Sequence, residues 1–553
     1  MPLPCPLPVA ALEALAAAHG TPFQLYDEAG IRANCRRLLR AFGARFAGFE
    51  QFFAVKALPN PAVLRVLVEE GCGLDCSSVS ELHIARALGV PGARCLYTGN
   101  YTSAADLAFA CDFGATVNLD DVSLVRTLAA LRGARGFPAL ISFRLNPGLG
   151  RTDSETPSNV LGGKEAKFGV PPESIVEAYR QARAAGATRF GMHMMTGSCV
   201  MNPAYWDETV GILLDAVASV RRALPGVEFE FVNIGGGLGI PYRPDQAPVD
   251  VEALAAQLQA CVARRWALVV AGEPAPQRAP PRLVMENGRF MTGPFGWLVA
   301  RCEAEKRAWG QRYLGLDACM SNLMRPGMYG AYHHITVRAR RARRSRKRAR
   351  AARARAARAR ASNFRAPPSF PAIPHACASQ VPAREPAAAG AAAAAAVETA
   401  PANVVGTLCE NNDWFAKERP LPAAARVGDL FVVHDTGAHS HSMGFQYNGK
   451  LRAPELLLRE RPAGAGAAVV DVIRERETVE CLYDNAVMPR DLAEGLPPSY
   501  PYLACSGGAA RRARPQVAAV PALAATALAG ALVALAVAAA VVRTRGALAR
   551  AGI

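Results

Sequence analysis

The chain has 553 residues, of which 51% are hydrophobic and 20% are charged. These values exclude a wholly disordered chain, a collagen-like chain and a small disulfide scaffold, and the length leaves room for several domains. A net charge of +17 would indicate a nucleic-acid or anionic-membrane partner if it were spread over the folded part. However, residues 338–365 carry 14 Lys and Arg and no acid, and six more arginines follow residue 510. The remaining chain is near neutral, so we expect no nucleic-acid partner.

The cysteines and the N-terminal residues bear on the compartment. The 14 cysteines are scattered without CxxC pairs, and the first 20 residues lack the basic start and long apolar core of a signal peptide. We therefore expect a reducing compartment, either the cytoplasm or, as an alternative, the plastid stroma. Most of the cysteines are expected to be small buried apolar residues, with Cys409 as an exception.

Between about residues 50 and 290, short β-rich runs alternate with longer segments whose apolar residues recur at i, i+3, i+4 and i+7. The runs predict strands and the longer segments predict amphipathic helices. Eight strands with interleaved helices predict an α/β fold, a TIM-like (β/α)8 barrel over residues 28–296. The predicted strands are 51–56, 73–77, 94–99, 115–120, 139–145, 190–195, 229–235 and 282–287.

From residue 297 the sequence changes to β-branched runs and turns, which predict a second, all-β domain of the barrel or sandwich type over residues 297–492. An Arg/Ala/Pro-rich stretch at 338–402 interrupts it. This stretch predicts a disordered or partly helical insertion without a core strand. The tail, 493–553, holds an uncharged apolar run at 517–542 that is long enough to cross a bilayer.

Polar residues follow the apolar strands of the predicted barrel, where its reactive groups are expected. Lys56 closes the first strand, and its amine is a candidate Schiff-base nucleophile if the barrel mouth desolvates it; a single lysine of this kind is otherwise a solvated surface residue. Gly235–Gly237 follow the seventh strand and could approach a phosphate, although three glycines alone could be a tight turn. Glu286 follows the eighth strand. An amine, a phosphate cradle and a buried acid together fit pyridoxal phosphate.

Longer motifs follow one another along the chain. They are FFAVKALPNP, LDCSSVSEL, GMHMMTGS, NIGGGLGIPY, ENGRFMTGP, SNLMRPGMYGAYHHI, CENNDWFAKERPLP and HDTGAHSHSMGFQYNGKLRAPE. In these motifs the chain resembles the pyridoxal-phosphate-dependent amino-acid decarboxylases of the alanine-racemase fold, in particular the diaminopimelate decarboxylases. The resemblance covers about residues 20–337 and 403–490, and it implies a barrel plus a β-domain to which residues 1–27 contribute.

The resemblance implies a role for individual residues, and it implies no metal. Lys56 would bond to the cofactor aldehyde, and Cys409 would donate a proton to the substrate Cα. The implied cofactor contacts are Lys56, His193, Ser198, Gly235, Gly236, Gly237, Glu286, Asn287, Gly288, Arg289 and Tyr447. The implied substrate contacts are Arg289, Arg325, Tyr329, Glu410 and Tyr447. Two guanidiniums suit the distal carboxylate of diaminopimelate. In this family the Cys-Glu segment reaches the neighbouring subunit, which implies a homodimer with shared active sites.

The implied reaction is the decarboxylation of meso-2,6-diaminopimelate to L-lysine and CO2, the last step of lysine biosynthesis. The alternatives are a decarboxylase for carboxynorspermidine, ornithine or arginine, and a catalytically inactive regulatory homologue. The chain departs from the family pattern at three places: Met195 replaces a histidine that stacks on the cofactor ring, Asn287 replaces the proline of EPGR, and CENND replaces a CESGD-like motif.

Some remaining features have two readings. The Arg-rich run at 338–365 is interpreted as a solvated disordered segment or as translated non-coding sequence, rather than as an arm that binds nucleic acid. The apolar run at 517–542 is interpreted either as a membrane anchor or as spurious translated sequence. His439 and His441 resemble a metal pair only superficially. His333 and His334 are expected to serve the β-domain.

Overall fold

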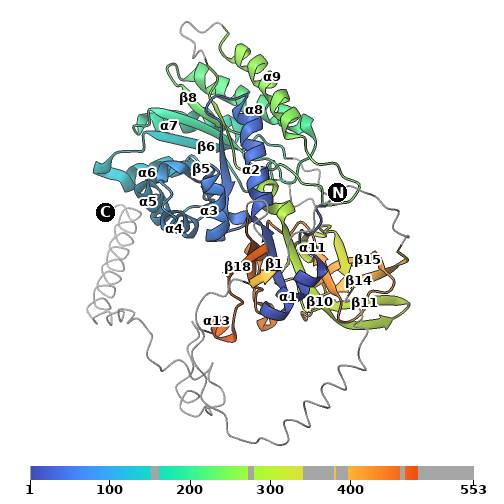
Figure 1. Cartoon of the computed structure of the whole chain (residues 1–553). Coiled ribbons are helices and arrows are strands. Elements are labelled where there is room, and N and C mark those ends of the chain that lie inside the picture. Colours follow the sequence, from blue (N-terminus) through green and yellow to red (C-terminus); the bar gives the residue numbers. More distant parts are fainter. Residues whose placement is uncertain are drawn as a thin grey trace, which may run out of the picture. The chain divides into compact units, whose positions relative to one another are not determined.

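The computed structural model describes residues 2–150, 161–271, 279–339, 379–381, 397–460 and 468–483. Residues up to Thr478 form one compact unit, and residues from Val479 form a second one. The first unit holds a barrel and a large sheet (Figure 1). In the second unit, the described part is the short helix α13 (Val479–Tyr483).

Eight parallel strands close into a barrel in sequence order, which confirms the predicted (β/α)8 architecture. Each observed strand overlaps the segment that was predicted for it, because strands buried on both faces read as continuous apolar runs. The strands are β2 (Glu50–Ala54), β3 (Gly73–Cys76), β4 (Cys95–Tyr97), β5 (Thr116–Leu119), β6 (Leu140–Leu145), β7 (Arg189–Met194), β8 (Phe229–Asn233) and β9 (Arg282–Met285).

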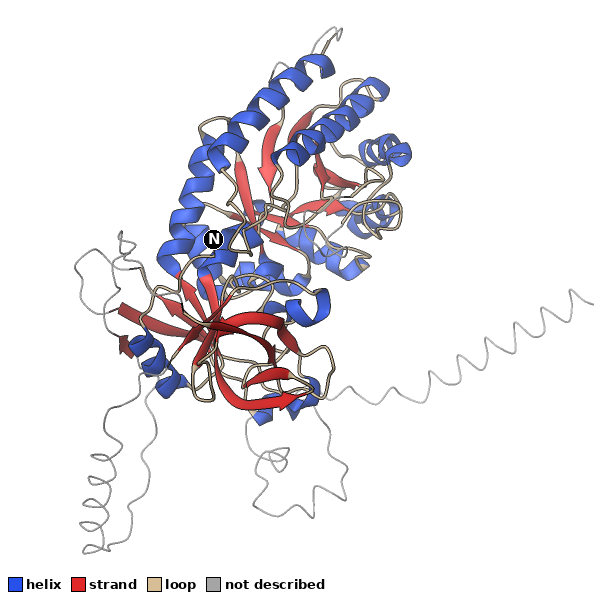
Figure 2. Ribbon diagram, turned by 90° about the vertical axis from the view of Figure 1, so that its right-hand side faces the viewer, coloured by secondary structure: helices blue, strands red, loops and turns tan. Residues whose placement is uncertain are grey.

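Helices surround the barrel strands (Figure 2). They are α2 (Glu28–Gly43), α3 (Pro61–Glu69), α4 (Val79–Ala87), α5 (Ala104–Phe113), α6 (Leu124–Arg132), α7 (Pro172–Ala184), α8 (Pro203–Ala223) and α9 (Val251–Val269). Local sequence fixes where several of them begin. Asn60 and Asn202 each accept a backbone N–H from the second residue after them and are followed by proline, the residue favoured in a first helical turn. The buried faces of the helices and strands form one continuous apolar core.

The second part of this unit is a ten-stranded sheet that begins before the barrel and continues after it. β1 pairs antiparallel with β10 and parallel with β17, and α2 follows β1 directly. The N-terminal strand therefore belongs to the sheet. Its members are β1 (Phe23–Asp27), β10 (Gly296–Ala308), β11 (Gln311–Leu316), β12 (Ile335–Arg338), β13 (Ser379–Val381), β14 (Thr399–Val405), β15 (Trp414–Pro422), β16 (Leu430–Val433), β17 (Glu455–Leu458) and β18 (Ala468–Arg474).

Short helices complete the unit. They are α1 (Val9–His19), α10 (Arg289–Thr292), α11 (Arg325–Tyr329) and the 3-10 turns η1 (Val55–Ala57), η2 (Gly92–Arg94), η3 (Gly133–Arg135), η5 (Gly293–Phe295), η6 (His441–Met443) and η7 (Tyr447–Gly449). The turns η1 and η7 and the helices α10 and α11 carry residues that the sequence assigns to the active site.

The expected insertion at 338–402 differs from the structure at its C-terminal end. β13 lies within this range and pairs antiparallel with β18, and β14 begins at Thr399. Ala402 is buried in the core of the sheet. The expectation that this stretch supplies no core strand is wrong there, because Ala and Pro fill the first half of β14 and its two valines, Val404 and Val405, follow the stretch. The rest of 340–396 lies outside the described residues.

Neither a membrane span nor a metal cluster is found in the described ranges. No helix there is long and apolar enough to cross a bilayer, and no three His, Cys, Asp or Glu side chains group as metal ligands. The candidate span at 517–542 lies outside the described residues.

Candidate active site

Lys56 lies in η1, directly after β2, and Glu286 directly follows β9, the strand that pairs with β2. The two residues thus leave neighbouring strands at the carboxyl end of the barrel, where (β/α)8 enzymes place their catalytic groups. Lys56 is close enough to act electrostatically on Asp75, Glu286 and His439. The Lys56 side chain is exposed in the single chain. The desolvation that the sequence argument required is therefore not supplied by this chain alone.

Glu286 is a buried carboxylate that receives two hydrogen bonds. Asn233 Nδ2 donates to its Oε1 at 2.6 Å, and His193 Nε2 lies 3.1 Å from its Oε2. Burial alone would raise its pKa, but the charge of His193 and these hydrogen bonds lower the pKa below the ordinary value of a glutamate. Glu286 is therefore held as an anion at neutral pH.

Asp75 is the second buried acid near Lys56, and it behaves in the opposite way. Burial and the charge of Glu286 raise its pKa well above the usual range of an aspartate. Of two neighbouring buried carboxyls, Glu286 holds the negative charge and Asp75 the proton.

The segment Gly235–Gly237 forms a close-packed turn after β8. Gly235 and Gly237 have φ angles of 70° and 107°, values that side chains other than glycine rarely adopt. A Cβ at Gly236 would lie 2.3 Å from the backbone oxygen of Glu286. Asn287 joins the same place: its Oδ1 accepts the N–H of Leu238 at 3.3 Å, and its Nδ2 donates to Gln51 at 3.0 Å. An asparagine where the family has proline therefore ties three barrel segments together.

Arg289 and Arg325 are buried, with 8% and 5% of their surfaces exposed. Arg289 donates to Tyr242 Oη at 2.6 Å and to Ser198 Oγ at 3.3 Å. Arg325 Nη1 lies 2.7 Å from His333 Nε2. Tyr242 links the pair, because its ring also lies 4.6 Å from the Arg325 guanidinium carbon. The structure thus brings together the predicted residues Ser198, Arg289 and Arg325.

Cys409, Glu410 and Tyr447 form a separate, exposed group. Cys409 N donates to Asn448 Oδ1 at 2.6 Å, which places the Cys-Glu segment beside η7. Within the described residues, Cys409 and Glu410 make no hydrogen bond or ion pair with the arginines or with Lys56. Tyr447 is 49% exposed. Tyr329, which ends α11, is half-buried and acts electrostatically on Arg325. Of the twelve described cysteines, all of them free thiols, Cys409 is one of two that are exposed.

The sequence predicted no role in the active site for Asn233, Tyr242 or His333. Tyr242 follows the glycine turn in the motif GIPY, and His333 was expected to serve the β-domain. His333 does bond to that domain, since its Nδ1 lies 2.8 Å from the His434 carbonyl oxygen, but its other nitrogen meets Arg325. The sequence did contain a signal for these three residues, because each is a polar residue within or next to an apolar motif. Their contacts could not be predicted, since contacts between distant segments produce no periodic pattern in the sequence.

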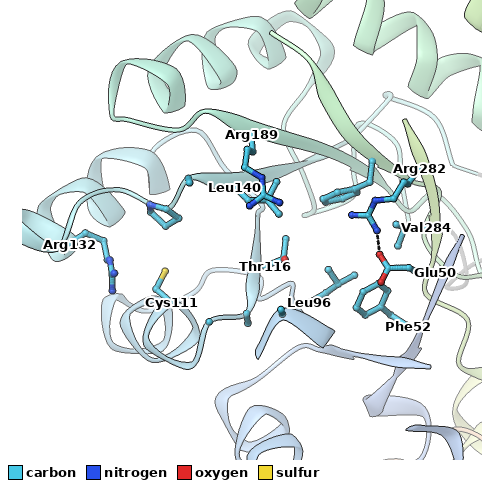
Figure 3. A pocket seen from close by; sticks show the side chains of 16 residues that line it. Glu50, Phe52, Leu96, Cys111, Thr116, Arg132, Leu140, Arg189, Arg282 and Val284 are labelled. Atoms are coloured by element: carbon cyan, nitrogen blue, oxygen red, sulfur yellow. Dashed lines mark hydrogen bonds and ion pairs between the residues drawn. The ribbon is translucent and has the colours of Figure 1, made fainter. Parts of the chain in front are cut away.

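A cavity of about 450 Å³ lies at the opposite end of the barrel (Figure 3). Its floor is apolar, and its charged rim is already paired: Glu50 bonds to Arg94 and Arg282, Arg189 to Glu230, and Arg132 to Asp112. It lies at the N-terminal ends of β2, β5, β6, β7 and β9, away from the strand ends that carry Lys56 and Glu286.

Comparison with known proteins identifies the family. Residues 29–293 match the family described as "Pyridoxal-dependent decarboxylase, pyridoxal binding domain", and residues 369–437 match its C-terminal sheet domain. "Protein TabA" of Pseudomonas amygdali pv. tabaci is 37% identical over 81% of this chain and 88% of its own length. The chain belongs to the pyridoxal-dependent decarboxylases. A diaminopimelate decarboxylase of Methanothermobacter thermautotrophicus is 34% identical over 86% of this chain and 94% of its own length.

Solved structures agree with this assignment. Diaminopimelate decarboxylase from M. jannaschii, crystallised with L-lysine, superposes with a TM-score of 0.67 at 26% identity and covers 87% of this chain and 95% of its own. The barrel and the sheet therefore follow the architecture of this enzyme family, and the resemblance read from the sequence is confirmed.

The cofactor of the family is pyridoxal phosphate, and the barrel mouth fits it. The glycine turn after β8 excludes side chains, because a Cβ at each glycine would collide with the backbone of Met194, Glu286 or Gly197. A turn free of side chains is what a phosphate cradle uses. Glu286 is an anion suited to a protonated pyridine nitrogen. The His193 ring, whose Nδ1 is buried without a described partner, lies beside Glu286. The sulfur of Met195 packs against Gly235.

Proposed function

We propose that the protein decarboxylates meso-2,6-diaminopimelate to L-lysine and CO2. The observation that carries this proposal is the buried pair Arg289 and Arg325. Among the described residues, neither guanidinium has a carboxylate within ion-pair distance. Burying two cations without counter-ions is costly unless a ligand brings the anion, and the distal carboxylate of diaminopimelate is such an anion. An ornithine-like substrate would leave both guanidiniums facing no charge.

The chain's own residues then divide the work. Bound pyridoxal phosphate supplies an electron sink for the electron pair that departing CO2 leaves behind. Glu286 holds the proton on the ring nitrogen, so that the ring keeps its positive charge. Lys56 would hold the cofactor through its amine, at the aldehyde carbon. Arg289 and Arg325 orient the substrate through its distal carboxylate, which fixes the carboxylate that leaves at the other end.

Cys409 delivers the proton to the substrate Cα, and Glu410 binds the distal amine, in a homodimer with shared active sites. What supports this part is the exposure of both side chains and the open mouth around Lys56 in a single chain. A second subunit that places its Cys409–Glu410 segment over the neighbouring barrel would both bury Lys56 and complete the site.

Substrate preference tests the proposal, since the relatives include both diaminopimelate decarboxylases and a protein named TabA. CO2 release by the cofactor-loaded full chain is measured with meso-diaminopimelate, carboxynorspermidine, ornithine and arginine. We expect kcat/KM to be at least about 100-fold higher for diaminopimelate than for ornithine, because a site that binds a polar group rejects analogues lacking it. Arg325→Met should lower this ratio towards one.

Two results would overturn the proposal. A preference for ornithine or arginine would remove the assignment of the two arginines. Absence of CO2 release from every substrate, with cofactor bound, would make the chain an inactive regulatory homologue.

A further inference from the structure

Arg289 and Arg325 are two like charges in one buried site, and their coexistence requires an explanation. Both are buried, and Arg289 acts electrostatically on Arg325. Like charges repel more strongly in a low-dielectric interior than in water. The usual solution in proteins is a carboxylate between them, but the ion pairs of the described chain include neither residue.

His333 explains how Arg325 is held. The His333 Nδ1 lies 2.8 Å from the carbonyl oxygen of His434, and because a carbonyl can only accept, Nδ1 carries the proton. Burial and the neighbouring Arg325 hold the pKa of His333 well below its usual range, so the ring is neutral. Its Nε2 then has a free lone pair, which accepts from Arg325 Nη1 at 2.7 Å. A neutral ring thus orients the guanidinium without cancelling its charge.

Tyr242 holds both arginines at once. Its hydroxyl accepts from Arg289 Nη1 at 2.6 Å. Its ring lies 4.6 Å from the Arg325 guanidinium carbon and 5.8 Å from that of Arg289, distances at which a ring face attracts cations. The ring also meets His333 edge-on at 5.0 Å. One side chain therefore accepts from one cation and offers its π-system to both.

The surroundings of the pair also leave its charge intact. Asp435 acts electrostatically on Arg325, but burial raises the pKa of this carboxyl to about 8, so it is mostly protonated at neutral pH. His439 faces both arginines, and burial and their charges keep its pKa well below the usual range of a histidine. Arg419 Nη1 donates to the backbone oxygen of His333 at 2.9 Å and fixes that residue from behind.

We propose that Tyr242 and His333 are positioning residues that hold Arg289 and Arg325 as an un-neutralised pair, and so select substrates with a distal carboxylate. This inference rests on the proposed function. It goes further because it assigns substrate selection to Tyr242 and His333. Both offer neutral hydrogen-bond acceptors, whereas a carboxylate at either place would neutralise the positive charge of the arginines. Neutral partners keep the pair both ordered and charged.

Variants at the two residues test it in the cofactor-loaded full chain. Tyr242→Phe removes the hydroxyl and keeps the ring, and His333→Leu removes the acceptor. We expect each to raise KM for meso-diaminopimelate about 10- to 100-fold with kcat changed by less than about threefold, as loss of a positioned binding group predicts. His333→Gln, whose side-chain oxygen can replace the acceptor, should restore KM to within about threefold. Tyr313→Phe, in β11, is the matched control and should leave both constants unchanged.

A carboxylate at the same place gives the opposite test. His333→Glu should pair with Arg325 and raise KM for diaminopimelate more than His333→Leu does, although the Leu side chain removes more hydrogen bonding. The thermal midpoint of each variant shows whether it folds, and Tyr242→Phe carries the test if His333→Glu does not.

The outcomes separate the two proposals. Suppose that the wild-type chain uses diaminopimelate. The positioning role is then refuted, and the proposed function stands, if Tyr242→Phe and His333→Leu leave KM unchanged. The same holds if His333→Leu raises KM but His333→Gln does not restore it. If the wild-type chain prefers a substrate without a distal carboxylate, both proposals fall.

Discussion

The substitution Glu286→Gln tests the electrostatic centre of the site. Glu286 accepts hydrogen bonds at both carboxylate oxygens, from Asn233 at 2.6 Å and from His193 at 3.1 Å. An amide can accept at only one. It would keep its oxygen towards Asn233 and place its NH2 near His193 Nε2. The variant should therefore fold with cofactor bound.

The expected loss follows from removing the charge. A hydrogen bond to an ionised group contributes about 1.5–3 kcal/mol, and a neutral one about 0.5–1.5 kcal/mol. If the difference, about 1–2 kcal/mol, applies to the proton on the cofactor nitrogen and is fully expressed in the transition state, kcat falls by a factor of about 5 to 30. This factor is a lower bound, because the buried carboxylate also acts on the ring through its charge at longer range.

The assay is single-substrate CO2 release at saturating cofactor, with cofactor occupancy read from its absorbance. Glu230→Gln is the matched control, because Glu230 lies on β8 next to Arg189, at the other end of the barrel. A Glu286→Gln enzyme with full occupancy and a kcat within about threefold of the wild type would refute the role assigned to this carboxylate.

Two further predictions concern assembly and pH. In the first, Lys56→Ala and Cys409→Ala chains are mixed in equal amounts, dissociated and reassociated, and CO2 release is measured before and after mixing. Shared sites should restore about a quarter of the wild-type activity, because half of the dimers are mixed and each mixed dimer has one intact site. Sites built within one chain would restore no activity. Asp435 is buried and its pKa is raised from 3.8 to about 8. The folded state therefore holds a proton that the unfolded state has lost, so its stabilising effect is present below about pH 4 and is lost as the pH rises to about 8. Asp435→Asn should flatten the fall in the free energy of unfolding between pH 5 and 8, as measured by urea denaturation at each pH; an equal slope in both proteins would contradict the burial argument.

The barrel could be predicted because each of its strands satisfies a strong local rule. Strands such as β6 and β8 are buried on both faces, so their sequences read as short apolar runs, and glycines or polar residues mark their ends. From the residues alone the sheet was predicted only as a β-rich region from residue 297, and the family resemblance added residues 1–27 to it. Its first strand, β1, lies between two helices and pairs with strands about 270 and 430 residues later in the chain, so no local pattern could reveal its place.

The site residues divide along the same line. Glu286 and Gly235–Gly237 could be predicted because they stand at strand ends. Lys56 also follows a strand, but the desolvation expected for it is not found, since its side chain is exposed in this chain. The contacts of Tyr242 and His333 with Arg289 and Arg325 could not be predicted, because they join segments that share no pattern in the sequence.

The site holds its two buried arginines with neutral partners. The Arg325 guanidinium donates to the neutral ring of His333, and Arg289 donates to the hydroxyl of Tyr242. A full counter-ion at either place would satisfy the same hydrogen bonds, but it would also cancel the field that a ligand must meet. Neutral partners thus order the two cations and leave their charge for a carboxylate. Replacing such a partner by a charged residue should therefore impair binding more than deleting it, which is the order expected for His333→Glu and His333→Leu.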